Sequence, residues 1–154
     1  MAMGYVISHK LFVRVRFLQQ YLQFINYMET EIRYSHKILS EILLDYESDT
    51  EFKNFLLIVL ENLKSKMFFY EAGKESVKKI PNSYGLLNQD KELILRFGEV
   101  VGTTDVNGQI AICRLNKSLV CSALENAKEE KIKKSKLYFM LSSSLGMCIA
   151  IILL

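Results

Sequence analysis

The last eighteen residues of the chain, from Leu137 to Leu154, carry no charged side chain. A helix rises 1.5 Å per residue, so this segment would extend ~27 Å, close to the roughly 30 Å of a bilayer's hydrocarbon core. The alternative is a buried helix that ends a soluble domain. A terminal helix that is apolar on every face has little protein left to cover it. The sequence therefore favours a transmembrane helix over residues 137–154.

The charged residues around this segment are distributed unequally. No charged side chain follows it, whereas five lysines precede it: Lys128, Lys131, Lys133, Lys134 and Lys136. An excess of lysine on one side of a span predicts that this side is cytoplasmic. The same lysines are typical of a juxtamembrane anchor that contacts anionic lipid. The net charge of the whole chain, +3, is too small to indicate nucleic acid as a partner.

The rest of the chain predicts an all-α fold, an antiparallel helical bundle over residues 4–134. Only one proline and seven glycines interrupt 154 residues, so long helices meet few breakers. Helices are expected over residues 6–34, 37–46, 51–66, 70–80 and 88–101, and from 106 onward. No breaker separates the last helix from the apolar segment. We therefore expect one continuous rod from the bundle into the bilayer.

Two apolar stripes define the expected helix contacts. In the first helix the stripe has a heptad-like spacing, which predicts a seam against another helix; it comprises Leu11, Val15, Leu18, Leu22, Ile25 and Ile32. In the last helix the stripe comprises Ile110, Cys113, Val120, Leu124 and Ala127. Glu29 occupies a position on the first stripe. A carboxylate there needs a hydrogen-bond partner or a cation across the seam.

Local signals predict where helices begin and end. Ser35 can cap the second helix, and Ser48 with Glu51 has the spacing of a capping box ahead of the third. The segment Pro81–Gly85 is typical of a turn. Gly102 is expected to end one helix and Asp105 to cap the next. Such a short link makes the two helices antiparallel neighbours.

The sequence contains no motif for catalysis, cofactor binding or metal binding. His9 and His36 lack cysteine or carboxylate partners at ligand spacing. The three cysteines form no CxxC pair, and we interpret all of them as reduced core or membrane residues: Cys113, Cys121 and Cys148. We expect no enzymatic activity, no cofactor and no metal.

One group of residues remains as a candidate site: Glu29, Glu31, Tyr34, Phe97, Gly98, Glu99, Gly102 and Asp105. Paired carboxylates could serve acid–base catalysis, but no pocket residues accompany them. A structural role is the favoured interpretation, and a partner-docking patch is a further one. Glycine inside a helix costs roughly 1 kcal/mol relative to alanine. Gly98 could offset that cost by letting another helix approach closely.

Several stretches resemble the stage III sporulation protein AB family. Residues 97–105 and Gln109 resemble its Phe-Gly-Glu-x-x-Gly-x-x-Asp signature. Residues 29–34 match its Glu-x-Glu-Ile-x-Tyr segment, and residues 39–41 match the stretch that follows. The sequence Ser144-Leu145-Gly146 and the apolar tail are similar to its C-terminal membrane helix. The resemblance extends from Gly4 to the end of the chain.

The chain departs from this family in two places. Family members usually have proline before the leucine at Leu39, where this chain has Ile38, so the second helix is expected to begin earlier. Members also begin with a membrane helix whose end corresponds to about Gly4–Tyr5. We therefore expect that the chain is trimmed at its start, that Met1–Met3 are not native, and that the native protein is anchored at both ends.

The resemblance implies a part of the channel-like apparatus that links mother cell and forespore during endospore formation. The family is similar to the cytoplasmic helical domains of the inner-membrane platform protein of type II secretion and type IV pilus systems. By that analogy the chain would be a platform in the mother-cell membrane that docks a secretion-type ATPase and other apparatus proteins. The alternative is a tail-anchored adaptor or lipid-binding anchor unrelated to sporulation.

A stripe of small residues lies along the apolar segment. Ser142, Gly146 and Ala150 recur every four residues, which places them on one helix face. Small residues let the backbones of membrane helices approach closely. The stripe therefore predicts packing against another membrane helix and leaves an oligomer in the membrane open, although membrane helices also simply tolerate small residues.

Overall fold

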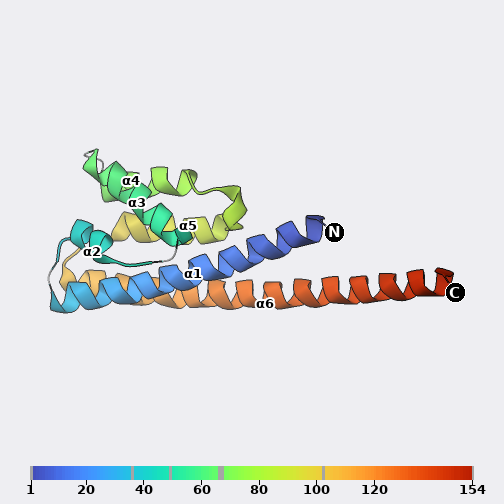
Figure 1. Ribbon diagram of the computed structural model, residues 1–154. Coiled ribbons are helices and arrows are strands. Elements are labelled where there is room, and N and C mark those ends of the chain that lie inside the picture. Colours follow the sequence, from blue (N-terminus) through green and yellow to red (C-terminus); the bar gives the residue numbers. More distant parts are fainter. Residues whose placement is uncertain (1, 36, 49, 66–67, 102, 154) are drawn as a thin grey trace.

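The computed structural model describes residues 2–35, 37–48, 50–65, 68–101 and 103–153. Its described residues form helices and connecting turns, which confirms the predicted all-α class. Two long helices run antiparallel to each other, and four shorter ones lie on one side of this pair (Figure 1). The elements are α1 (Ala2–Tyr34), α2 (Leu39–Asp45), α3 (Thr50–Lys64), α4 (Phe69–Lys78), the 3₁₀ turn η1 (Asn82–Tyr84), α5 (Asn88–Val100) and α6 (Val106–Leu153).

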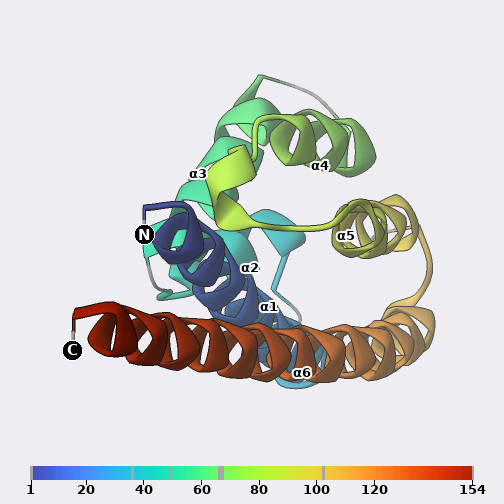
Figure 2. The same cartoon turned by 90° about the vertical axis from the view of Figure 1, so that its right-hand side faces the viewer.

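The helices close a ring around a common core. Going around the ring, α1 packs on α6, α6 on α5, α5 on α4, α4 on α3, and α3 again on α1. Figure 2 shows this arrangement, with α3, α4 and α5 stacked over the long pair. We refer to this ring, up to residue 136 of α6, as the bundle.

The contact between α1 and α6 uses the two predicted stripes. Five of the six α1 residues are buried and Leu22 is half-buried, while four of the five α6 residues are buried and Ile110 is half-buried. Val15 and Leu18 pack with Leu124 and Ala127 in a small cluster between the two helices. The heptad-like spacing therefore correctly identified the seam.

Aromatic side chains fill the centre of the ring. The ring centroid of Phe17 lies 5.2 Å from that of Phe52 and 5.8 Å from that of Phe55, both edge-on. Tyr21 meets Phe97 of α5 at 6.3 Å. Each such pair contributes about 0.5–1.5 kcal/mol beyond the burial of its surface. This cluster holds α3 and α5 against the middle of α1.

The turn predicted over Pro81–Gly85 is present as η1. Gly85 has a φ of 66°, in the left-handed region, and a Cβ added there would lie 2.5 Å from the carbonyl oxygen of Lys10. Glycine alone has both the conformational freedom and the space for this position. The turn can therefore press directly on the backbone of α1.

Some predicted helix boundaries are wrong. The first helix begins at Ala2, four residues before the expected Val6. The second covers only Leu39–Asp45, and its N-cap, Ile38, makes no side-chain capping bond, so Ser35 does not cap it. His36 and Gly102 lie outside the described residues.

The predicted capping box at the start of α3 is not formed either. Among the described residues, Ser48 Oγ has no hydrogen-bond partner. Glu51 instead binds Arg16 of α1, and this ion pair lowers the pKa of the Glu51 carboxyl. The Glu51 carboxylate thus binds a cation on the neighbouring helix, whereas the local pattern predicted that it would accept a hydrogen bond from the backbone.

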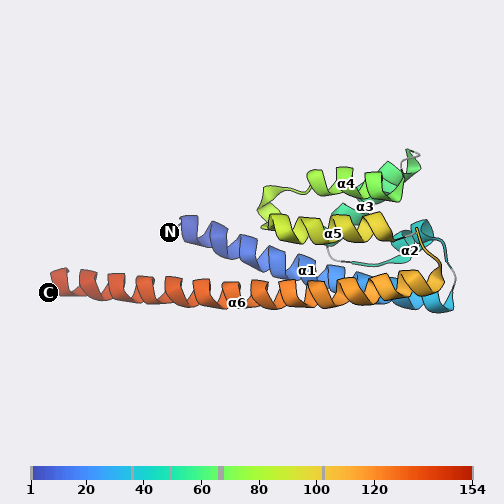
Figure 3. The same cartoon turned by 180° about the vertical axis from the view of Figure 1, so that it is seen from behind.

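The last helix is continuous over 48 residues, as predicted. Its first part lies in the bundle, and its remainder extends alone past the N-terminus of α1 (Figure 3). We call residues 137–152 the apolar segment; every side chain in it is exposed except the half-buried Tyr138. By length and composition α6 is a candidate membrane span. No residue of its most apolar stretch is buried within the protein. The boundary that we predict between residues 134 and 137 falls inside this helix and stays a prediction.

Candidate functional site

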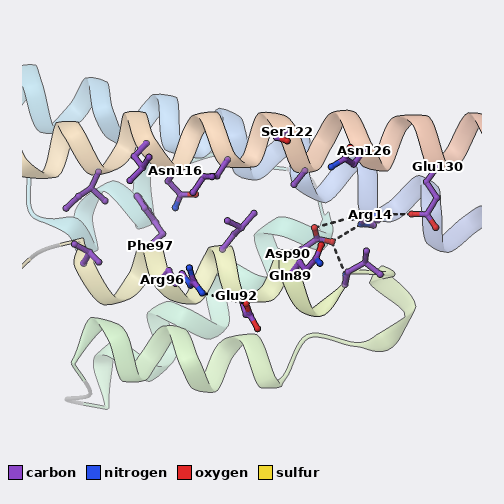
Figure 4. Close-up of a pocket in the computed structure, with 17 residues that line it drawn as sticks. Arg14, Gln89, Asp90, Glu92, Arg96, Phe97, Asn116, Ser122, Asn126 and Glu130 are labelled. Atoms are coloured by element: carbon purple, nitrogen blue, oxygen red, sulfur yellow. Dashed lines mark hydrogen bonds and ion pairs between the residues drawn. The ribbon is translucent and has the colours of Figure 1, made fainter.

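A groove of about 600 Å³ lies between α5 and α6 on the surface of the bundle (Figure 4). Leu93 and Phe97 of α5 and Ile112 of α6 are among its lining residues. Large apolar side chains on its lining stay exposed to solvent: Leu115 (64%), Leu119 (47%), Leu87 (45%) and Val100 (40%). An apolar groove with a polar rim is the usual form of a surface that buries a partner.

A buried ion cluster closes one end of this α5–α6 groove. Arg14 of α1 donates from Nε to Asp90 Oδ2 at 2.7 Å, from Nη2 to Asp90 Oδ1 at 3.1 Å, and from Nη1 to Glu130 Oε2 at 2.9 Å. Arg14 and Asp90 are only 4% and 1% exposed. The guanidinium therefore joins α1, α5 and α6 in one place, as the dashed lines in Figure 4 show.

Asp90 has a second role in this cluster. Its Oδ2 accepts a hydrogen bond from the backbone N–H of Leu87 at 2.9 Å, which satisfies a donor at the start of α5. The same carboxylate thus caps α5 and binds Arg14. A charge this deeply buried is stable only when it is paired and hydrogen-bonded, and both conditions are met.

Glu130 connects the cluster to the lysine-rich part of α6. Lys134 Nζ lies 2.6 Å from Glu130 Oε1, one turn along the helix. Lys134, and after it the charge and hydrogen bond of Arg14, hold the pKa of Glu130 below its ordinary value. Glu130 is therefore ionised at neutral pH and bridges two cations.

Asn116 ties the lining of the groove to the aromatic core. Its Nδ2 donates to Tyr21 Oη at 3.1 Å, and both residues are buried. Burial raises the pKa of the Tyr21 hydroxyl, so the phenol stays protonated. The bond positions α6 relative to α1.

The structure gives the predicted candidate residues separate surroundings. Glu29 accepts from Arg33 Nη2 at 2.6 Å and from Arg114 Nε of α6 at 3.1 Å, so it has the cation across the seam that its position requires. Glu31 lies 3.3 Å from Lys37 Nζ. Tyr34 is 74% exposed at the end of α1.

The residues of the second predicted stretch are likewise distributed over different roles. Phe97 is buried in the core and also lines the α5–α6 groove. Glu99 is exposed, whereas Glu29 is half-buried and paired with Arg33 and Arg114. The two carboxylates therefore have different surroundings.

The close helix approach expected at Gly98 is absent. Among the described residues, a Cβ added to Gly98 would meet only Phe69 Cε1, at 3.9 Å, which is ordinary van der Waals contact. Alanine would fit there. The space arises because α4 presents a side chain rather than its backbone to this position.

Gly108, at the start of α6, has little space around it, and this was not predicted from the sequence pattern. Asp105 caps α6 through a hydrogen bond from the Gly108 N–H to Asp105 Oδ1 at 3.1 Å, which confirms the predicted cap. A Cβ on Gly108 would lie 2.8 Å from Thr104 and 2.9 Å from that carboxylate oxygen. The spacing Asp-x-x-Gly was the signal that could have identified this tight capping turn.

The cysteines are free thiols, and the most buried of them is Cys113. Burial, and then the charge of Glu29, raise the pKa of the Cys113 thiol to about 11, so it is protonated at neutral pH. All three cysteines are free; Cys121 is half-buried and Cys148 is exposed on the apolar segment. No described group of three or more His, Cys, Asp and Glu side chains could hold a metal ion.

Together these features define an all-helical bundle protein with a candidate membrane span and an apolar surface groove. The family model for Stage III sporulation protein AB (spore_III_AB) matches residues 1–154. The chain therefore belongs to the stage III sporulation protein AB family, and membership supports a role in stage III of sporulation. Neither the comparison with curated proteins nor the comparison with solved structures finds a match.

Proposed function

We propose that the protein is a non-enzymatic membrane platform of the mother cell–forespore channel apparatus. In this proposal the apolar segment anchors it in the mother-cell membrane that faces the forespore. The lysines before residue 137 favour a cytoplasmic bundle. The bundle docks a secretion-type ATPase, and other stage III apparatus proteins assemble on the same platform. The ATPase is taken from the analogy with secretion platforms, and the family match supports the sporulation role.

The observation that carries the docking step is the exposed apolar lining of the α5–α6 groove. Full burial of one large aliphatic side chain stabilises a complex by about 1.5–3 kcal/mol. Leu115 and Leu119 project from successive turns of α6 and are 64% and 47% exposed. An amphipathic helix of the ATPase could place apolar side chains at matching helical intervals.

The rigidity of the groove supports the same proposal. Arg14 and Asp90 fix one end of α5 against α1 and α6, and Phe97 fixes the last turn of α5 in the core. Two helices held in this way lose little freedom on binding. A pre-organised groove therefore loses less conformational entropy on binding than a mobile one, and its affinity for the partner is higher.

The test is co-purification of the full-length protein with the ATPase from the spore-forming host. We expect Leu115→Arg with Leu119→Arg to reduce the bound ATPase by about tenfold or more, because two cations would replace the apolar lining. The matched control is Leu57→Arg, since Leu57 is 52% exposed on α3 and does not line this groove. The control should bind as well as the parent protein.

Two outcomes would contradict the proposal. If the groove variants keep the ATPase while Tyr34→Ala or Glu99→Gln loses it, the docking surface lies at those residues and not in the groove. If the parent protein itself never retains the ATPase in repeated trials, the adaptor interpretation replaces the platform.

A further inference from the structure

A second groove, of about 520 Å³, lies between α1 and α6 next to the candidate membrane span. The part of α6 that lines it ends at Lys136, and the apolar segment begins at the next residue. With a rise of 1.5 Å per residue, Lys131 lies ~9 Å along the helix from Leu137. Headgroup layers extend roughly 5–8 Å beyond the hydrocarbon core. If α6 crosses a bilayer at residue 137, the Lys136 end of this α1–α6 groove lies within the headgroup layer, and Lys131 lies near its outer edge.

The lysines of this part of α6 are sorted between its faces. Lys133 and Lys134 pair with Glu129 and Glu130, at 3.6 and 2.6 Å. Both acidic residues of this part are thus paired with lysines that do not line the α1–α6 groove.

Three other lysines line the groove: Lys128, Lys131 and Lys136. Within the described residues none of these three has a carboxylate at ion-pair distance. Arg16 also lines the groove, but it is paired with Glu51 and adds little net charge. The groove therefore carries about three uncompensated positive charges, which favours an anionic ligand.

Apolar side chains share the groove with these lysines. Phe12 is 46% exposed and Ile132 is 56% exposed. Lys131 Nζ lies 4.6 Å from the centroid of the Phe12 ring, a cation–π contact that holds the ammonium over the groove. A free phosphate would use only the charges. A lipid would use both the charges and the apolar surface.

We propose that the α1–α6 groove binds the phosphate headgroup of one anionic phospholipid. Lys128, Lys131 and Lys136 surround the phosphate, and Phe12 and Ile132 contact the glycerol and the other carbon atoms of the headgroup. The position next to the candidate span delivers such a lipid without any approach from solution. This site is independent of the α5–α6 groove, so it does not depend on ATPase docking.

The experiment places the full-length protein in nanodiscs of mixed phosphatidylglycerol and phosphatidylcholine and counts the retained lipids by native mass spectrometry. A lysine at an anionic surface changes partitioning by roughly fivefold. Lys128→Gln with Lys131→Gln should therefore lower the ratio of bound phosphatidylglycerol to phosphatidylcholine by about tenfold or more. The control, Lys133→Gln with Lys134→Gln, removes the same formal charge outside the groove. Because these two lysines are already paired with Glu129 and Glu130, the control should lower the ratio clearly less than the groove variant does.

Carbonate extraction shows whether each variant is inserted, so lost lipid selectivity is not confused with lost anchoring. Equal loss in both double variants, or in neither, would overturn the specific site and leave only diffuse attraction. Added inorganic phosphate at constant ionic strength should leave the ratio of the parent protein unchanged. If phosphate lowers it to the level of the groove variant, the site binds free phosphate and the lipid assignment is wrong.

Discussion

The two parts of α6 are one helix in two different environments. Up to residue 136, buried residues such as Cys113, Val120 and Leu124 alternate with exposed polar ones, and the buried side faces α1. In the apolar segment the described side chains are almost all exposed, although they are apolar on every side. The helical backbone continues unchanged from one part to the other.

This difference shows which property of the sequence specifies the surroundings of a helix. A stripe with a 3.6-residue period needs protein on one side and water on the other. A largely apolar segment without charged residues needs an apolar environment on all sides, and the bundle covers almost none of it. Lipid would supply that environment, and the two parts should then respond differently to the same kind of substitution.

The largest effect is expected where α1, α5 and α6 meet. Arg14→Met would leave Asp90 buried without its cation, and breaking such a pair costs about 3–5 kcal/mol. The free energy of unfolding of the bundle should fall by that amount in denaturant titrations followed by circular dichroism. Arg96→Met is the control, since the Arg96 side chain is 78% exposed and should matter by less than about 0.5 kcal/mol. Equal effects of the two substitutions would show that the Arg14–Asp90 pair does not stabilise the bundle.

The next effect belongs to the apolar segment. Leu145→Arg would place a cation at the centre of the span, which costs about 2.5–3.5 kcal/mol of insertion free energy. We expect a large fraction of the protein to become extractable by carbonate, with the bundle still folded. Glu125→Arg, at an exposed position of the first part, should remain membrane-bound. Normal insertion of Leu145→Arg would show that this segment does not cross the bilayer.

A smaller effect tests the stripe of Ser142, Gly146 and Ala150. All three are exposed, and a Cβ on Gly146 would meet no described atom within 4 Å, so the bundle does not use this face. If the stripe packs against another membrane helix, Gly146→Leu should weaken association by about 0.6–2 kcal/mol without blocking insertion. A two-helix association assay in membranes measures this. Association equal to that of the parent would mean that the small residues are only tolerated.

The smallest effect concerns how the stability of the bundle depends on pH. Because Lys134 and Arg14 lower the pKa of Glu130 in the folded protein, this carboxylate stabilises the bundle above its unfolded pKa. That contribution is lost as the pH falls through the lower, folded pKa. Glu130→Gln should therefore be less stable than the parent by about 1 kcal/mol at neutral pH. The difference should shrink in acid, and a difference that grows there would have the wrong sign.

The parts of the fold that depend on local pattern could be predicted from the sequence. The seam of α1, the turn at Gly85, the Asp105 cap and the continuity of α6 all follow from residues a few positions apart. Two other predictions failed because residues distant in the sequence determine the surroundings of Glu51 and Gly98. Arg16 takes the carboxylate of Glu51 from the expected capping box, and Phe69 leaves room at Gly98.

The α5–α6 groove and its ion cluster could not be predicted in the same way. Arg14 is separated from Asp90 by 76 positions and from Glu130 by 116. No periodicity relates such residues, because only the packing of three helices brings them together. One signal was present, since Arg14 and Arg16 interrupt the otherwise apolar run from Leu11 to Leu18. It indicated a buried charge but not its partners.

The most direct test of the two environments of α6 is a pair of nitroxide labels on the full-length protein in lipid vesicles. The native cysteines are first replaced, and single cysteines are then placed at Glu125 and Leu145, both exposed in the structure. Electron paramagnetic resonance compares collision with a water-soluble nickel complex and with oxygen. The account predicts dominant nickel contact at position 125 and dominant oxygen contact at position 145. Dominant nickel contact at both positions would contradict it.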